Sequence, residues 1–317
     1  MRVLVTGSKG IIGQKISGEL KQRGHSVFGI DLLHHAGETG FMQEISHESW
    51  EYARCDIGEY RQIERIILEA GPFDLVYNCA AEFGRWNGED YYEQMWKSNL
   101  IGLKNIIRLQ EKYKFKLVHF SSSEIYGDFD GVMTENVPEK YVINQMNDYA
   151  ISKWANELQI RNSRIMYGTE TVIVRLFNTY GPGEYYHPYR SAICKFCYHA
   201  LKGLPITVYK GHYRSNSYID DCAKAITSIT DNFIPGRIYN IGSDGYCNMG
   251  KIANIIWDYM GADRELIKME NKEEILTTKK KQIDIGLSIK ELGYKSTVGL
   301  EEGIKRTIEW MKEYYKI

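Results

Sequence analysis

Residues 1–13 read Met1-Arg-Val-Leu-Val-Thr6-Gly7-Ser8-Lys9-Gly10-Ile11-Ile12-Gly13, and this stretch decides the fold. A short β-branched run enters a glycine turn, and the turn opens an amphipathic segment typical of a helix. The first glycine permits the tight turn, the second lets the backbone approach a pyrophosphate, and the third brings the helix close to the strand. The stretch therefore predicts a strand–turn–helix unit that binds a dinucleotide, contacting it through Gly7, Lys9, Gly10, Ile11, Ile12 and Gly13.

Asp31 follows Gly13 by 18 residues and ends a second apolar run, Ser26-Val-Phe-Gly-Ile-Asp31. A carboxylate at this distance accepts a hydrogen bond from a ribose 2′-hydroxyl and repels a 2′-phosphate, so NAD is favoured over NADP. The alternative is a glycine-rich strand–helix turn that binds no ligand.

Composition excludes several kinds of partner. The formal net charge of −1 gives no electrostatic footprint for nucleic acid or for an anionic membrane. No apolar run approaches the ~20 residues that span a bilayer, so we expect a soluble, cytoplasmic protein. The six cysteines contain one C-x-x-C pair, Cys194 and Cys197, with no second pair and no histidine at ligand spacing. We therefore expect free thiols and no metal site.

Apolar β-type runs alternate with helical patterns through the first half of the chain. Strands are expected near 2–6, 26–31, 52–55, 74–78, 116–121 and 171–176, and helices near 11–23, 59–70, 90–112 and 147–167. This alternation predicts an α/β fold with a Rossmann-type, doubly wound parallel sheet of about seven strands, the seventh near 237–241. We expect an NAD-binding domain over 1–177 with 214–241 returning to it. A smaller, mainly helical substrate domain then comprises 178–213 and 242–317.

Two groups of residues carry the expected chemistry. Tyr149 and Lys153 are four residues apart in a helical stretch and share a helix face, so the ammonium, together with the positive charge of the cofactor, is expected to lower the pKa of the phenol. Ser122, Ser123 and Glu124 follow the fifth strand at its carboxyl end, where open parallel sheets bind ligands.

The chain resembles the extended short-chain dehydrogenase/reductase superfamily, in its NAD-dependent nucleotide-sugar epimerase/dehydratase branch. The resemblance extends over essentially the whole chain. It rests on Thr6-Gly7-x-x-Gly10-x-x-Gly13, Asp31, Asp56-Ile57, Asn78-Cys-Ala80-Ala81, Ser98-Asn99-x-x-Gly102, Ser122-Ser-Glu-Ile-Tyr126-Gly127, Tyr149/Lys153, Arg175-Leu-Phe-Asn178-x-Tyr180-Gly181-Pro182 and Tyr218-Ile-Asp220-Asp221.

The resemblance implies roles for these positions. Tyr149, Ser122 and Lys153 would oxidise the sugar at C4, with Lys153 holding the nicotinamide ribose. Further cofactor contacts would come from Asp56, Ile57, Ala80, Ala81 and Asn99. Substrate contacts would come from Glu82, Asn178, Arg190 and Arg214, the last suited to a diphosphate. Residues 277–281 lack the arginine that many relatives present to that diphosphate.

The residue at position 124 helps to distinguish the family reactions that begin with a 4-keto sugar. The dehydratases carry a glutamate two residues beyond the serine, which removes the C5 proton; dTDP-glucose 4,6-dehydratases precede it with aspartate, where this chain has Ser123. We therefore expect a nucleotide-sugar 4,6-dehydratase, with the donor of the proton to the leaving hydroxyl left open. The alternatives are a nucleotide-sugar 4-epimerase, a UDP-glucuronate-type decarboxylase using Arg190 or His187 for the carboxylate, and, remotely, a non-catalytic NAD-binding sensor.

Two further expectations concern surfaces. The tyrosine-rich stretch 178–190 either stacks on the nucleotide base or packs the domain edge. The stretch 90–112 has apolar residues on more than one side, and the resemblance implies a homodimer in which it pairs with 147–167 as a four-helix bundle.

Overall fold

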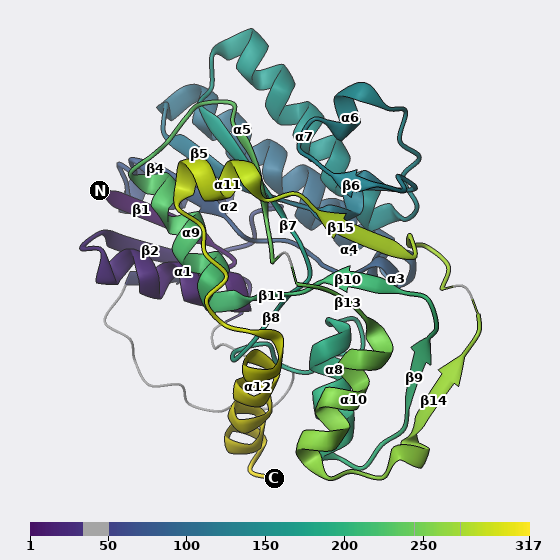
Figure 1. Cartoon of the computed structure of the whole chain (residues 1–317). Helices are drawn as coiled ribbons and strands as arrows, with labels where there is room; N and C mark the ends of the chain where they lie inside the picture. The colour runs from purple at the N-terminus through teal and green to yellow at the C-terminus, as the bar shows by residue number, and fades with distance from the viewer. Residues whose placement is uncertain (34–50, 244, 273) are drawn as a thin grey trace.

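The computed structural model describes residues 1–33, 51–243, 245–272 and 274–317. Its centre is a seven-stranded parallel sheet in the order β12-β7-β5-β4-β1-β2-β3, which confirms the predicted doubly wound α/β fold (Figure 1). The seven strands are β1 (Arg2–Thr6), β2 (Ser26–Asp31), β3 (Glu51–Arg54), β4 (Leu75–Asn78), β5 (Lys116–Ser122), β7 (Thr171–Leu176) and β12 (Ile238–Ile241).

Alternate residues of the central strands enter different cores on the two faces of the sheet. In β1, Val3 and Val5 join one core cluster and Leu4 joins the other. The two-residue period of a strand makes this separation, and burial on both faces explains the near-continuous apolar runs in the sequence. The flanking helices are α1 (Ile11–Gln22), α9 (Ile219–Thr227) and α11 (Gly286–Leu292) for the first cluster, and α2 (Tyr60–Ala70), α5 (Gly102–Tyr113) and α7 (Asp148–Tyr167) for the second.

The helix expected over 90–112 is confirmed: α4 (Tyr92–Trp96), a π-helical turn over Lys97–Ile101 and α5 follow one another without a gap. A short helix that was not expected, α3 (Arg85–Asp90), precedes it, and Tyr91, at φ −134° and ψ 56°, separates the two. π-Helical turns commonly occur at functional sites. Here the turn contains buried Asn99, which hydrogen-bonds to the segment after β4.

A second lobe lies beside the sheet (Figure 1). Its helices α8 (Ala192–Leu201), α10 (Met249–Met260) and α12 (Leu300–Tyr315) enclose a third core cluster around Trp257 with the paired strands β9 (Ile206–Tyr209) and β14 (Ile267–Glu270). Ile283, Ile285 and Leu292, by contrast, pack in the first cluster of the large sheet. The clusters support a two-domain division, which we retain as a proposal, with 283–294 packed on the first domain.

Short elements join the two lobes. A small sheet runs in the order β13 (Tyr246–Asn248), β10 (Tyr213–Ser215), β15 (Lys280–Ile283) and β6 (Val132–Met133). The remaining elements are the strand pair β8 (Thr179–Tyr180) and β11 (Ser217–Tyr218), helix α6 (Val137–Lys140) and 3₁₀ turns over Ser123–Tyr126, Ser228–Thr230 and Arg264–Leu266. Among the described residues, no helix combines the length and apolarity that a bilayer crossing requires.

A prediction concerns the close contact between the glycine turn and α1. A Cβ on Gly13 would lie 2.1 Å from the Gly7 carbonyl oxygen, which is backbone and cannot yield without moving the turn. We expect Gly13→Ala to lower the free energy of unfolding by about 1–3 kcal/mol, measured by urea unfolding, and to weaken NAD binding.

Gly18→Ala is the matched control in the same helix, because a Cβ there meets no atom within 4 Å. It should be neutral or stabilise the protein by about 0.5–1 kcal/mol. Equal effects of the two substitutions would show that the contact does not constrain the turn.

Candidate active site

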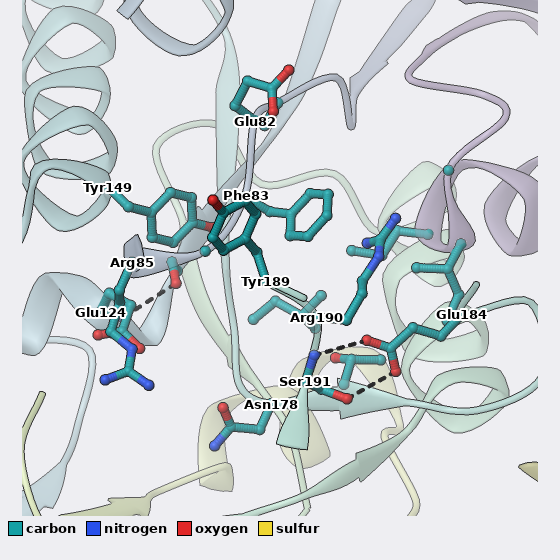
Figure 2. Close-up of a pocket in the computed structure, with 18 of the residues that line it drawn as sticks. Glu82, Phe83, Arg85, Glu124, Tyr149, Asn178, Glu184, Tyr189, Arg190 and Ser191 are labelled. Carbon is teal, nitrogen blue, oxygen red and sulfur yellow. Dashed lines mark hydrogen bonds between the residues drawn. The ribbon is translucent and has the colours of Figure 1, made fainter. Parts of the chain in front are cut away.

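A cavity of about 910 Å³ lies at the carboxyl ends of the parallel strands, between the two lobes. Open α/β sheets bind ligands at this edge because the strand order reverses there, between β1 and β4. Figure 2 shows Tyr149 and Glu124 on one side of the pocket and Glu184, Arg190 and Ser191 on the other.

The glycine turn forms one end of this cavity. Gly7 adopts φ +63°, a conformation that favours glycine, and its carbonyl accepts the Gly10 N–H at 3.1 Å. Gly10 caps α1 without a side-chain hydrogen bond. The first N–H groups of a helix have no intrahelical acceptor, so α1 presents them at the turn.

Asp31 lies beside the turn at the end of β2. Its carboxylate accepts hydrogen bonds from the backbone N–H groups of Lys9 at 2.9 Å and Leu33 at 3.1 Å. Burial raises the pKa of Asp31, and these hydrogen bonds oppose the shift. The side chain thus remains on the cavity wall, held in place by backbone contacts.

Tyr149, Ser122 and Lys153 lie together on the cavity wall. Lys153 Nζ donates to the Phe120 carbonyl at 2.8 Å, and burial lowers its pKa to about 8. Burial also raises the pKa of Tyr149 to about 12, although a hydrogen bond with Ser122 opposes the shift. In the protein alone, burial therefore favours the neutral phenol, and the predicted lowering of the Tyr149 pKa, which included the positive charge of the cofactor, stays a prediction.

Glu124 opens the 3₁₀ turn after β5, where its N–H donates to Ser122 Oγ at 3.2 Å. Its carboxylate forms an ion pair with Lys281 Nζ. Burial alone would raise the pKa of Glu124, but the charges of Lys281, Arg85 and Arg214 hold it below its ordinary value. Glu124 is therefore an ionised carboxylate on the cavity wall beside Ser123.

The four predicted substrate residues also line the cavity. Arg214 Nη1 donates to the carbonyls of Tyr213 and Lys279, both at 2.8 Å, so this nitrogen is occupied by the protein itself. The Arg190 guanidinium lies 3.8 Å from the centroid of the Phe83 ring. Asn178 donates to the Ser215 carbonyl at 3.4 Å, and Glu82 accepts from Asn87 at 3.0 Å.

Most predicted cofactor residues line the same cavity, namely Gly7, Gly10, Ile11, Ile12, Gly13, Asp31, Asp56, Ile57, Ala80, Ala81, Tyr149 and Lys153. Lys9 and Asn99 do not. Asn99 lies behind the wall, accepting the Glu82 N–H at 2.9 Å and donating to the Glu82 carbonyl at 3.1 Å. It therefore fixes the backbone of a lining segment rather than facing the cavity.

Sequence reasoning missed several charged residues at the site. Arg85 lines the cavity with one nitrogen on Glu274 at 2.8 Å and with Nη1 buried without a hydrogen bond to any described residue. Its place after the carboxyl end of β4 was an available signal. Lys195 and His212 line the cavity as well. Lys281 had no local signal, because it reaches Glu124 across 157 positions.

The tyrosine-rich stretch mostly packs the domain edge. Tyr186 stacks on Tyr198 with ring centroids 3.8 Å apart, and Tyr185 packs on Trp310 and Tyr314. Tyr189 alone of these tyrosines lines the cavity. His187 contacts Phe83 and Tyr189 outside the lining, and burial lowers its pKa, so it does not supply a cation there.

Cys194 and Cys197 are buried free thiols. In the part of the chain that the structure describes, no three His, Cys, Asp or Glu side chains are grouped to hold a metal ion.

The sheet order, the glycine turn with Asp31, and the Tyr149–Lys153–Ser122 group define a dinucleotide-dependent enzyme of the short-chain dehydrogenase type. The sequence profile of the NAD dependent epimerase/dehydratase family matches residues 3–242, and the chain belongs to this family. NAD is the cofactor on which the family depends. The open glycine turn, the uncapped start of α1 and the carboxylate of Asp31 fit a dinucleotide with a free ribose 2′-hydroxyl.

Curated relatives span different reactions. The chain is 27% identical to a dTDP-glucose 4,6-dehydratase of Salmonella typhimurium, over 98% of this chain and 92% of that protein. It is 26% identical to a UDP-N-acetyl-alpha-D-glucosaminuronate decarboxylase of Bacillus cytotoxicus, over 98% of each. A crystal structure of Thermus thermophilus UDP-glucose 4-epimerase in complex with NAD superposes with a TM-score of 0.85, at 25% identity over 98% of this chain and 99% of that one. The comparisons thus define the family and leave the reaction undetermined.

The buried Lys153 gives a prediction about stability. Its pKa is about 8 in the folded protein and about 10.4 in an unfolded chain, so protonation below pH 8 favours unfolding. We expect Lys153→Met to raise the free energy of unfolding at pH 7 by about 1–3 kcal/mol, less the lost hydrogen bond to Phe120. The gain should shrink between pH 8 and about pH 10, as wild-type Lys153 loses its proton.

Urea unfolding at both pH values measures the effect, with exposed Lys268→Met as the control. A Lys153→Met protein less stable than wild type at pH 7 would contradict the burial penalty.

Proposed function

We propose that this chain is an NAD-dependent nucleotide-sugar 4,6-dehydratase. Glu124 carries the proposal, because a half-buried, ionised carboxylate two residues beyond Ser122 is a base next to the proposed oxidation site. A ketone at C4 acidifies the C5–H bond, and a carboxylate at that position can then drive loss of the C6 hydroxyl.

The first half of the proposed reaction belongs to Tyr149, Ser122 and Lys153. Tyr149 takes the proton of the sugar 4-hydroxyl, and Ser122 shares its hydrogen bond. Bound NAD supplies the hydride acceptor for C4, the later hydride donor to C6 and a positive charge that favours the Tyr149 phenolate. Lys153 orients the nicotinamide ribose from the same helix face.

We assign the remaining contacts of NAD and of the substrate to residues that line the cavity. The glycine turn and the start of α1 would bind the pyrophosphate of NAD, and Asp31 its adenosine ribose. Arg190 and Arg214 would bind the diphosphate of the substrate, together with Asn178. The free Arg85 nitrogen is a further donor at the sugar end, next to Glu124.

Arg85 also favours a second candidate, a uronate decarboxylase. A guanidinium with an unused nitrogen suits the carboxylate on C5 that such a substrate carries. The ionised Glu124 beside it disfavours a second carboxylate there, which is why we place dehydration first.

The reaction is tested by incubating the protein with UDP-, GDP-, CDP- and dTDP-hexoses and the corresponding hexuronates, and measuring product masses. We expect loss of water from one hexose. An unchanged mass with inverted C4 would establish epimerisation instead, and loss of carbon dioxide decarboxylation. Glu124→Gln should still oxidise C4 but accumulate bound NADH, seen by its near-ultraviolet absorbance. Normal turnover by Glu124→Gln would exclude the role of base, while Tyr149→Phe is the control that should form no NADH.

We further propose a homodimer through α7 and the neighbouring α5. Ile151, Leu158 and Ile165 are exposed on α7 at intervals of seven residues, which places them on one face. Ile101, immediately before α5, is exposed as well. An apolar stripe of this length is the kind of surface that a second helix pair covers.

Sedimentation at micromolar concentration tests the dimer. The wild type should sediment as a dimer and Leu158→Glu as a monomer, because a charge would be buried in the interface. Ile289→Glu, on exposed α11, is the control and should leave the dimer intact. A monomeric wild type would refute the interface.

A further inference from the structure

Two buried cations lie side by side at the cavity wall. Lys281 on β15 and Arg214 on β10 are register partners of parallel strands, and their exposed fractions are 2% and 9%. Neighbouring like charges repel, and burial increases the repulsion. Both face Glu124, whose carboxylate forms the ion pair with Lys281 Nζ. The negative charge of Glu124 thus offsets part of the repulsion between the two cations.

Lys281 is separated from the ligand space. Glu124 lines the cavity, whereas Lys281 is not among the lining residues. Its Nζ contacts the Glu124 carboxylate, which comes from a distant part of the chain. Glu124 is therefore the lining residue through which Lys281 makes direct contact with the site.

We propose that Lys281 is the positioning residue that keeps the Glu124 carboxylate ionised and oriented toward the cavity for proton transfer. This inference rests on the proposed function only for the identity of the proton that Glu124 moves.

The other groups that face Glu124 are Arg85 from α3, Arg214 from β10 and Tyr149 from α7. Arg85 is shared with Glu274, and Arg214 Nη1 is bound to two backbone carbonyls. Lys281 is the cation in direct contact, and its charge is the first of those that lower the Glu124 pKa. Its removal should therefore have the largest effect on that pKa, with the two arginines retaining part of the shift.

The proton balance explains why such a cation is useful here. Glu124 takes the C5 proton, and the electron pair of the C5–H bond forms the C5–C6 double bond as the C6–O bond breaks. The leaving oxygen needs a proton to depart as water. Ser123 is no acid, so the protonated Glu124 is the neighbouring group that can return one. An ammonium against the carboxyl lowers its proton affinity and favours this return.

The experiment compares Lys281→Met, Lys281→Arg and the control Lys280→Met, whose side chain is exposed on the same strand. The first readout is direct titration of the Glu124 carboxyl by carbon NMR in glutamate-labelled protein, with Glu124→Gln identifying the signal. The second is the pH dependence of kcat. Because the ion pair lowers the Glu124 pKa, loss of Lys281 should raise it, and the acid limb of kcat should move up by about 1–3 pH units. Lys281→Arg should restore most of the shift, and Lys280→Met should show none.

The NMR readout does not depend on the reaction. A Glu124 signal that titrates in wild type at or above the ordinary range of a glutamate would overturn the proposal, even if Lys281→Met did not fold. So would an unchanged pKa in folded Lys281→Met. A shifted pKa in a protein that releases no water would leave Lys281 as the positioning residue and reject only the dehydratase reaction.

Discussion

The contact between Gly13 and the Gly7 carbonyl is the constraint on which the rest of the site depends. The helix α1 can approach the sheet so closely only because neither position carries a Cβ that would displace backbone. The approach fixes where α1 starts, and α1 then packs Ile16 and Leu20 into the first core cluster with α9. A similar limit operates at Gly7, whose Cβ would meet Ala80 of the segment after β4 at 2.7 Å. One glycine turn therefore sets the spacing between two strands, a helix and the wall of the cavity.

Two side chains on the cavity wall, Tyr149 and Lys153, are ionisable groups whose charged forms are disfavoured by burial. Burial lowers the pKa of Lys153 and raises that of Tyr149, so both charged forms are disfavoured in the folded chain. Shifted pKa values are common at functional sites, because catalysis often needs a protonation state that the group would not have in water at neutral pH. Glu124 is the exception, since three cations overcome its burial. The protein thus holds the Glu124 carboxylate ionised with its own charges, whereas burial favours the neutral form of the Tyr149 phenol.

The structural features that depend on a local residue pattern were predicted from the sequence. Periodicity located all seven strands of the sheet, because buried parallel strands and amphipathic helices differ in period. The turn glycines, Tyr149 and Lys153 line one cavity as predicted, because the local geometry of each motif follows from its residue spacing. The short helix α3 was not predicted, because six residues are too few to show a helical period. Asn99, in the π-helical turn, contacts the backbone of Glu82, and its predicted contact with the cofactor stays a prediction.

The local pattern did not predict the charged residues around Glu124, the residue on which the proposed reaction rests. Lys281, Arg214 and Arg85 come from three separate elements and meet only in the folded chain. The stretch 277–281 lacks the arginine that was looked for as a ligand of the diphosphate, and its last lysine pairs with the Glu124 carboxylate. Arg85, from α3, supplies a half-buried guanidinium that also lines the cavity. These charged side chains pair across the fold rather than along the chain, so the proposed reaction depends on contacts that a local sequence pattern does not show.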